Sequence, residues 1–253
     1  MEDNRKRDKK CWLYSNETNM KSYVITLLDH EESTKASDQC IKSSKDVGND
    51  FEIYKFDAIT PDRVDRMMMS EKIKWNYPWE GQVSDFSTGL TKSAYPTKNQ
   101  KARIACSLSH YHLWKCCAYD NLPYLILEHD SFFIRQLDYN IISKSHKSII
   151  SINNPRFATR RAVEYLNKIK SSAPDMGGVV FAPTIDSTNV PQGLPGNSAY
   201  IIKTDGAKKM LKLVDDYGLW PNDALMCKQL IPNIGCTQKF YTRVQGVRST
   251  TSL

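Results

Sequence analysis

The sequence predicts an α/β protein with a mostly parallel central sheet flanked by helices. Short apolar segments alternate along the chain with longer, polar, helix-compatible segments, and this alternation is typical of α/β folds. One segment, residues 124–127, is continuously apolar, as expected of a central strand that is buried on both faces. A chain of 253 residues, 40% of them hydrophobic, is also long enough to bury one substantial core.

The first third of the chain predicts two strands around one helix. Ser22–Leu28 is rich in β-branched and aliphatic residues and too short for a helix, so it suits a buried first strand. A polar, helix-compatible stretch follows to about Lys45, and Phe51–Phe56 alternates apolar and polar positions as a second strand. Residues 75–99 carry prolines, glycines and aromatic residues without a period, which indicates a structured loop.

The middle of the chain contains its strongest signal. Apolar residues recur at helical spacing over 101–119, and Asn121 and Pro123 end that helix. The buried strand Tyr124–Leu127 follows and stops abruptly at Glu128-His129-Asp130. Acidic groups therefore lie at the carboxyl end of a central strand.

The second half predicts further alternation. Strands are expected at 148–152, 177–182 and 199–202, and helices at 160–170, from an N-cap at Thr204, and after Trp220.

Composition narrows the class of protein. No stretch approaches the roughly 20 apolar residues of a membrane-spanning helix, and the charged first ten residues do not resemble a signal peptide, so we expect a cytoplasmic protein. Residues 1–20 are expected to form a flexible basic N-terminus and residues 21–253 a single domain. The net charge of +7 favours acidic partners without requiring them.

The acidic pair suggests a metal site. Ligands of open α/β sheets bind beyond the carboxyl ends of the strands, where Glu128 and Asp130 are placed. Mg²⁺ and Mn²⁺ take carboxylate oxygens and complete their shells with water and substrate phosphates. The alternative interpretation is that Asp130 or Ser131 caps a helix.

Two other features have both structural and functional interpretations. Cys106 and His110 share a helical face, which is compatible with a metal cluster or with a structural histidine. A basic stretch with Glu164 as its local acid either holds phosphates or forms a solvated helix face with loops; it comprises Lys144, Lys147, Arg156, Arg160, Arg161, Lys168 and Lys170.

Several motifs, in the right order, resemble those of glycosyltransferase family 25, the lipooligosaccharide and collagen galactosyltransferase type. The helix Ala102–Trp114 with its Cys-x-x-Ser-His motif and the strand end Leu125–Asp130 are the central pair. The resemblance spans most of 22–248, and His129 stands where the family usually has Asp. The other matching segments are Tyr23-Val24-Ile25, Phe56-Asp57-Ala58, Gly196–Ile202, Gly206–Lys209 and Pro221-x-Asp223.

The resemblance implies a GT-A-like nucleotide-binding fold and a metal-dependent sugar transfer. Glu128 and Asp130 would be the acid-x-acid pair that binds Mn²⁺ or Mg²⁺, and Asp57 would lie near the nucleotide of a nucleotide-diphosphate sugar. His110 would touch the diphosphate or orient a carboxylate. Asn197 follows a glycine-rich loop and would contact donor or acceptor; we assign it to the donor.

An inverting transferase needs a general base for the acceptor hydroxyl. Asp223 is the candidate, because Pro221 would stiffen the loop before its helix, and a helix cap is the alternative. By analogy with the family, the acceptor is a cell-envelope saccharide of the kind built in lipopolysaccharide biosynthesis. A hydroxylated base in DNA and a non-catalytic nucleotide-sugar binding protein are the rival hypotheses.

Overall fold

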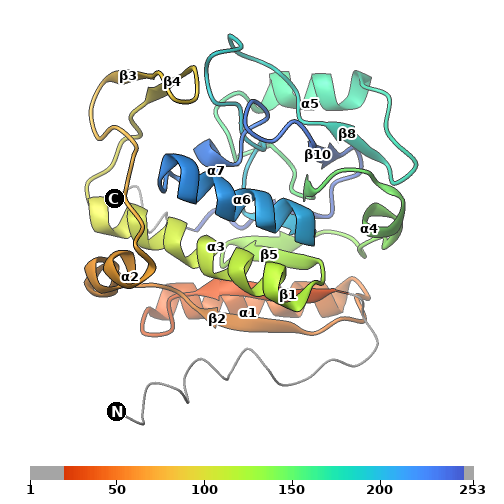
Figure 1. Cartoon of the computed structure of the whole chain (residues 1–253). Helices are drawn as coiled ribbons and strands as arrows, with labels where there is room; N and C mark the ends of the chain where they lie inside the picture. The colour runs from red at the N-terminus through yellow and green to blue at the C-terminus, as the bar shows by residue number, and fades with distance from the viewer. Residues whose placement is uncertain (1–19, 248–253) are drawn as a thin grey trace.

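A computed structural model describes residues 20–247 of the chain (Figure 1). The expected basic N-terminus therefore lies almost entirely outside the described residues. A seven-stranded sheet runs through the molecule in the order β2-β1-β5-β9-β7-β10-β8. Strands β9 and β8 run opposite to the other five, so the sheet is mostly parallel, as predicted. Its strands are β1 (Lys21–Thr26), β2 (Ile53–Asp57), β5 (Tyr124–Glu128), β7 (Ile149–Ser151), β8 (Val179–Phe181), β9 (Ala199–Ile202) and β10 (Ile234–Thr237).

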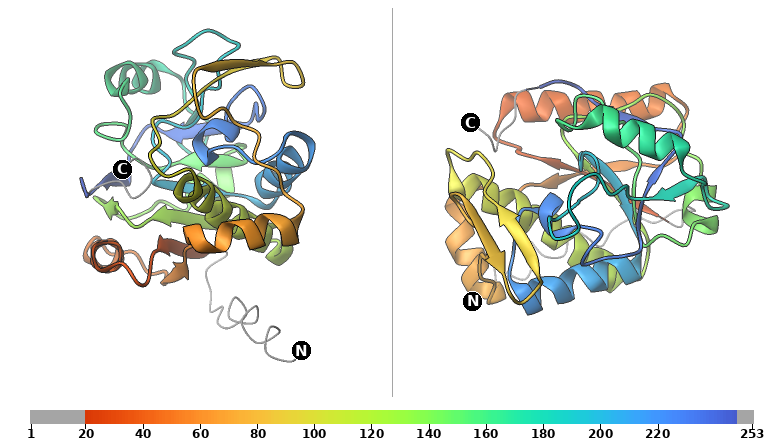
Figure 2. Two further views of the ribbon diagram at one scale, coloured as in Figure 1. Left: turned by 90° about the vertical axis from the view of Figure 1, so that its left-hand side faces the viewer. Right: turned by 90° about the horizontal axis from the view of Figure 1, so that it is seen from above.

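Helices cover both faces of this sheet. The main ones are α1 (Glu31–Asp46), α3 (Gln100–Asp120), α5 (Ala162–Ser171) and α6 (Thr204–Tyr217); shorter ones are η2 (Pro61–Arg63), α2 (Val64–Glu71), α4 (Asn140–Lys144) and α7 (Asn222–Leu225). Helices α3 and α6 lie side by side on one face, and α1 lies on the other (Figure 2).

Strand β5 shows why its sequence is apolar at every position. Tyr124 and Ile126 point into the core beneath α3 and α6, whereas Leu125 and Leu127 point into the core that includes Cys40 of α1. All four side chains have no solvent exposure. The predicted central strand is therefore confirmed, with β1 on one side and β9 on the other.

Several elements were not predicted from the sequence. Part of the region expected to be a loop forms the hairpin β3 (Gln82–Asp85) and β4 (Leu90–Ser93). The acidic turn after β5 leads into β6 (Ser131–Phe133), which pairs with β11 (Thr242–Val244), so neither Asp130 nor Ser131 caps a helix. Thr204 is the first residue of α6 rather than its N-cap.

Two residues of the predicted basic stretch are engaged with acids. Lys147 is buried, with its Nζ 3.9 Å from Asp175 Oδ2, and Arg161 pairs with both Glu164 and Asp186. Sequence neighbours alone suggested a single local acid, whereas folding brings in two distant ones. No helix among residues 20–247 is both long and apolar enough to cross a bilayer.

Candidate active site at the carboxyl ends of the strands

A cavity of about 540 Å³ lies at the carboxyl ends of β1, β2 and β5. Ile25 and Leu27 line it from the end of β1, and Ala58 and Ile59 line it just beyond β2. Because the chain leaves parallel strands at this edge, loops that are distant in sequence converge here. The residues predicted at the strand ends are therefore expected to line this cavity.

Glu128 and Asp130 both line this cavity. Glu128 ends β5, where its backbone N–H donates to the Ser198 carbonyl at 2.7 Å, and Asp130 lies in the turn to β6. Oδ1 of Asp130 is buried and has no hydrogen-bond partner among the described residues. Burial, and then the charge of Glu128, raises the pKa of Asp130 to about 7. Negative charge in this turn therefore lacks a compensating cation.

The pKa of Glu128 is shifted in the opposite direction by its neighbours. Burial by itself raises its pKa, but the hydrogen bond and charge of His110 outweigh burial, with smaller contributions from His129 and Arg103, and the net direction is downward. The two acids of the pair thus differ: Glu128 is held ionised while Asp130 resists ionisation. Such a split is common at functional sites.

A chain of hydrogen bonds holds His110 in the core, close to Glu128. Nε1 of Trp114 donates to the Tyr200 hydroxyl at 2.9 Å, so the hydroxyl proton is available for Nδ1 of His110 at 2.8 Å. The imidazole proton is then on Nε2, which lies 3.4 Å from Glu128 Oε1. All three supporting side chains are fully buried. His110 therefore lies within ion-pair distance of Glu128, which is compatible with the orienting role that the sequence offered as one option.

The structure also brings Cys106, His110 and Glu128 together, with ligand atoms within 4.8 Å of one another. This grouping is the sequence-predicted Cys–His pair with one carboxylate added. It is a less favourable site for a hard divalent ion, because it offers a thiol and an imidazole beside one carboxylate, and burial, followed by Glu128, raises the pKa of the Cys106 thiol. The carboxylate oxygens of Glu128 and Asp130 fit a hard divalent ion better.

Asp223 is in the first turn of α7 and also lines the cavity. The residue at the N-cap is Pro221, so Asp223 is not the cap. Burial raises the pKa of Asp223, Arg103 opposes this, and Glu128 adds to it. Arg103 is a cavity residue that sequence reasoning missed; its guanidinium lies 5.4 Å from the Tyr95 ring centroid.

Asn197 lines the cavity, and its amide nitrogen and oxygen are both buried without partners among the described residues. Asp57 is the exception among the predicted residues. Its exposed carboxylate lies 3.4 Å from Arg63, and its neighbours Ala58 and Ile59 line the cavity in its place.

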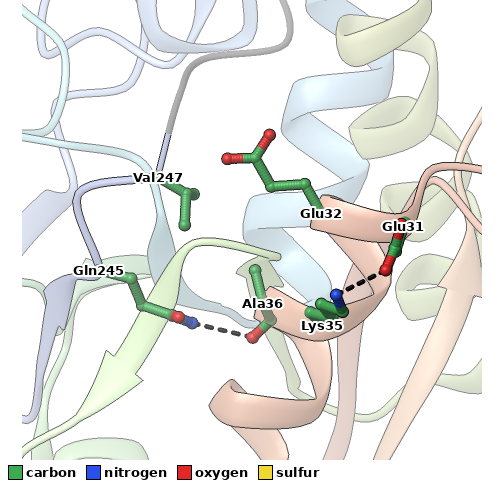
Figure 3. A pocket seen from close by; sticks show the side chains of 6 residues that line it. All are labelled: Glu31, Glu32, Lys35, Ala36, Gln245 and Val247. Atoms are coloured by element: carbon green, nitrogen blue, oxygen red, sulfur yellow. Dashed lines mark hydrogen bonds and ion pairs between the residues drawn. The ribbon is translucent and has the colours of Figure 1, made fainter.

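The C-terminal segment forms part of the wall. Gln245 donates from its backbone to the Asp130 carbonyl at 2.7 Å and from its side chain to the carbonyls of Ala36, His129 and Ser131. A second pocket of about 370 Å³ lies between this segment and α1; Figure 3 shows Gln245 reaching Ala36 there. Val247 lines both pockets, so this segment forms a wall that the two pockets share.

Three comparisons relate the chain to known proteins. The model of glycosyltransferase family 25 (LPS biosynthesis protein) matches residues 19–226. No curated protein matches the chain. Among solved structures, mouse xyloside xylosyltransferase 1 in its apo form is similar, with 8% identity and a TM-score of 0.36 over 85% of this chain and 80% of that chain.

Proposed function

Because the chain belongs to glycosyltransferase family 25, we propose that it transfers a sugar from a nucleotide-diphosphate donor to a hydroxyl of a cell-envelope saccharide, with inversion and with a divalent metal. The observation that carries the metal-dependent mechanism is the carboxylate pair at the end of β5. Oδ1 of Asp130 is buried without a partner, and the pKa of this carboxyl is raised. Both properties are expected of an acid whose charge is compensated only when a cation binds. Residues 21–253 would form one glycosyltransferase domain, located in the cytoplasm.

Glu128 and Asp130 would hold Mn²⁺ or Mg²⁺. When bound, such an ion would neutralise the negative charge that develops on the departing diphosphate. The protein prepares the pair by fixing Glu128 with His110, which is itself fixed by Tyr200 and Trp114. Arg103 supplies a protein cation in the same cavity, where its charge acts on both Glu128 and Asp223.

Asp223 would take the proton from the acceptor hydroxyl. A general base works best when its pKa is near the operating pH, and burial moves the pKa of Asp223 upward in that direction. The proton leaves the hydroxyl oxygen as that oxygen bonds to the anomeric carbon, and the diphosphate departs from the opposite side. The Asp57 carboxylate does not line the cavity, so it would contact the nucleotide only at its outer edge.

DNA is the weaker choice of acceptor. Lys147, Arg161 and Lys168 of the basic stretch are engaged with Asp175, Glu164, Asp186 or a backbone carbonyl, which leaves fewer cations for phosphates. If DNA were the acceptor, its binding should weaken steeply with added salt. Binding that is indifferent to salt would exclude it.

The proposed function is tested by release of nucleoside diphosphate from a panel of nucleotide sugars, with and without Mn²⁺. Metal-dependent release from one donor would support the transferase and identify its sugar. Binding of a nucleotide sugar without release, in the presence of both metal and saccharides, would instead indicate a non-catalytic binding protein.

A further inference from the structure

Phe157 has an unusual backbone at the mouth of the cavity. Its side chain is 88% exposed, it lines the cavity, and its φ is +67°. Two other non-glycine residues of the described chain have positive φ, Lys72 and Asn121, and each ends a helix, where that conformation is common. Phe157 ends no helix, and a bulky residue pays of order 1–3 kcal/mol for this conformation.

The surrounding loop holds Phe157 in this position. Ala158 donates its backbone N–H to the Pro155 carbonyl at 3.1 Å, and Asn154 Oδ1 accepts from the Arg156 N–H at 3.0 Å. These two bonds close a tight turn around the phenylalanine. The aromatic ring is thus presented to solvent at the cavity by a fixed turn, although burial would have been the favourable outcome for so large an apolar side chain.

The loop that contains Gly196 packs closely against the Phe157 turn. Gly196 has φ +85°, and a Cβ at this position would lie 2.5 Å from Ala158 Cβ and 2.9 Å from Asn153 Nδ2. Any side chain at Gly196 would push the Phe157 turn away. The next residue, Asn197, is only 8% exposed and has two unpartnered amide atoms in the same cavity.

The order of the strands places these residues across the carboxylate pair from the nucleotide side. Ile25 and Ala58 line the cavity at β1 and β2, which lie on one side of β5. The Phe157 turn follows β7 and Asn197 precedes β9, both on the other side of β5. Asp223 packs against the loop that leads to Asn197, since a Cβ at Gly193 would collide with the Asp223 carbonyl.

We propose that Phe157 and Asn197 form the subsite for the acceptor saccharide, an inference that rests on the proposed transferase function. A pyranose has an apolar C–H face and a polar edge of hydroxyls. The Phe157 ring would cover the apolar face, and the Asn197 amide, with one donor and one acceptor group, would bond neighbouring hydroxyls. Asn197 then serves the acceptor rather than the donor.

Saturation-transfer NMR with methyl pyranosides of glucose, galactose and mannose, combined with hydrolysis of the nucleotide sugar by water, tests this subsite. Phe157→Ala should weaken pyranoside binding about tenfold, the scale of one lost aromatic face. Metal-dependent hydrolysis, which needs no acceptor saccharide, should fall much less than pyranoside binding. Phe157→Gly removes the same ring without any backbone cost and should behave alike, whereas Phe157→Tyr should bind as the native chain does.

Phe86→Ala is the matched control. Phe86 is 98% exposed at the tip of the β3–β4 hairpin and does not line the cavity, so its loss should change neither readout. The subsite is refuted if Phe157→Ala binds pyranosides normally, if the native chain binds none of them, or if the variant loses nucleoside diphosphate binding instead. Pyranoside binding that depends on Phe157, in a chain that releases diphosphate from no donor, would refute the transferase but keep the subsite.

Discussion

Two partly buried acids, Asp85 and Asp130, show how differently the same side chain is used in two regions of this molecule. Asp85, in β3, lies 2.9 Å from Lys92 of β4, and the two side chains are 10% and 3% exposed. Burial raises the pKa of Asp85, but Ser87 and Lys92 more than compensate and lower it to about 2. Asp130 has no such partner, and its pKa is raised to about 7.

The difference in pKa between the two acids indicates a structural role for Asp85 and a functional role for Asp130. Lys92 also donates to the Asn76 carbonyl and lies 4.5 Å from the centroid of the Trp220 ring, so the ion pair fastens the hairpin to the body of the protein. The charge of Asp130 instead destabilises the fold that contains it. A folded protein that tolerates such a charge in a cavity is expected to use it for a ligand.

The largest effect is expected at the carboxylate pair. Asp130→Asn should lower sugar transfer on the order of 10³-fold, because it removes electrostatic stabilisation of the departing diphosphate. Steady-state rates with the donor identified from the panel measure this loss. Circular dichroism should show an intact fold, and a rate near that of the native chain would contradict the assignment.

Loss of the structural ion pair should act on stability. Lys92→Met leaves Asp85 buried and unpaired, so we expect the free energy of unfolding to fall by about 3 kcal/mol. Urea denaturation measures this change. Lys101→Met is the control, since its ion pair with Asp65 is 52% and 76% exposed and should contribute less than about 1 kcal/mol. Equal effects would show that the hairpin pair has no special role.

Removal of the proposed base should have a smaller effect on turnover than removal of Asp130. Asp223→Asn should lower transfer roughly 10²-fold, within the usual range for general-base catalysis, with donor binding nearly unchanged. Separate measurement of kcat and of the donor KM distinguishes a loss of turnover from a loss of donor binding. Weaker donor binding at an unchanged kcat would assign Asp223 to the donor instead.

The hydrogen-bond chain behind Glu128 should matter by about tenfold. Tyr200→Phe deprives Trp114 and His110 of their shared partner, which should cost about 1–3 kcal/mol of stability and release the imidazole from its orientation. Tyr124→Phe is the matched control, because that hydroxyl donates to Asp120 at the opposite end of β5. Both variants should lose stability, but only Tyr200→Phe should lose turnover.

The pH dependence of stability tests the raised pKa of Asp130. The pKa of Asp130 is raised from its ordinary value of 3.8 to about 7 in the folded chain, so folding favours the protonated form. Its contribution to stability is therefore lost as pH rises across this range. Between pH 4 and 7 in metal-free buffer, the Tm of the Asp130→Asn variant should fall less than the Tm of the native chain. Parallel curves would contradict the raised pKa.

The sequence predicted the regular part of the fold well. The buried run Tyr124–Leu127 and the alternation of strands and helices were sufficient for the α/β sheet. The β3–β4 hairpin was missed because Gln82–Asp85 and Leu90–Ser93 are mostly polar, and their stabilising pair, Asp85 with Lys92, becomes apparent only when the strands are aligned.

The candidate site was predicted where it depends on strand ends. Glu128 and Asp130 follow directly from the end of β5. Asp57 also ends a strand, but its side chain faces Arg63 and not the cavity, which the sequence does not specify. The bond between Tyr200 and His110 joins residues 90 positions apart, so it required the three-dimensional structure.

The carboxylate pair, and not the neighbouring cysteine and histidine, is expected to bind the catalytic metal. Electron paramagnetic resonance titration with Mn²⁺ tests this expectation directly in three proteins: the native chain, Asp130→Asn and Cys106→Ala. We predict that the native chain and Cys106→Ala bind Mn²⁺ alike and that Asp130→Asn binds it at least tenfold more weakly, on the scale of one lost ligand. Undiminished binding by Asp130→Asn, or loss of binding in Cys106→Ala, would contradict the account.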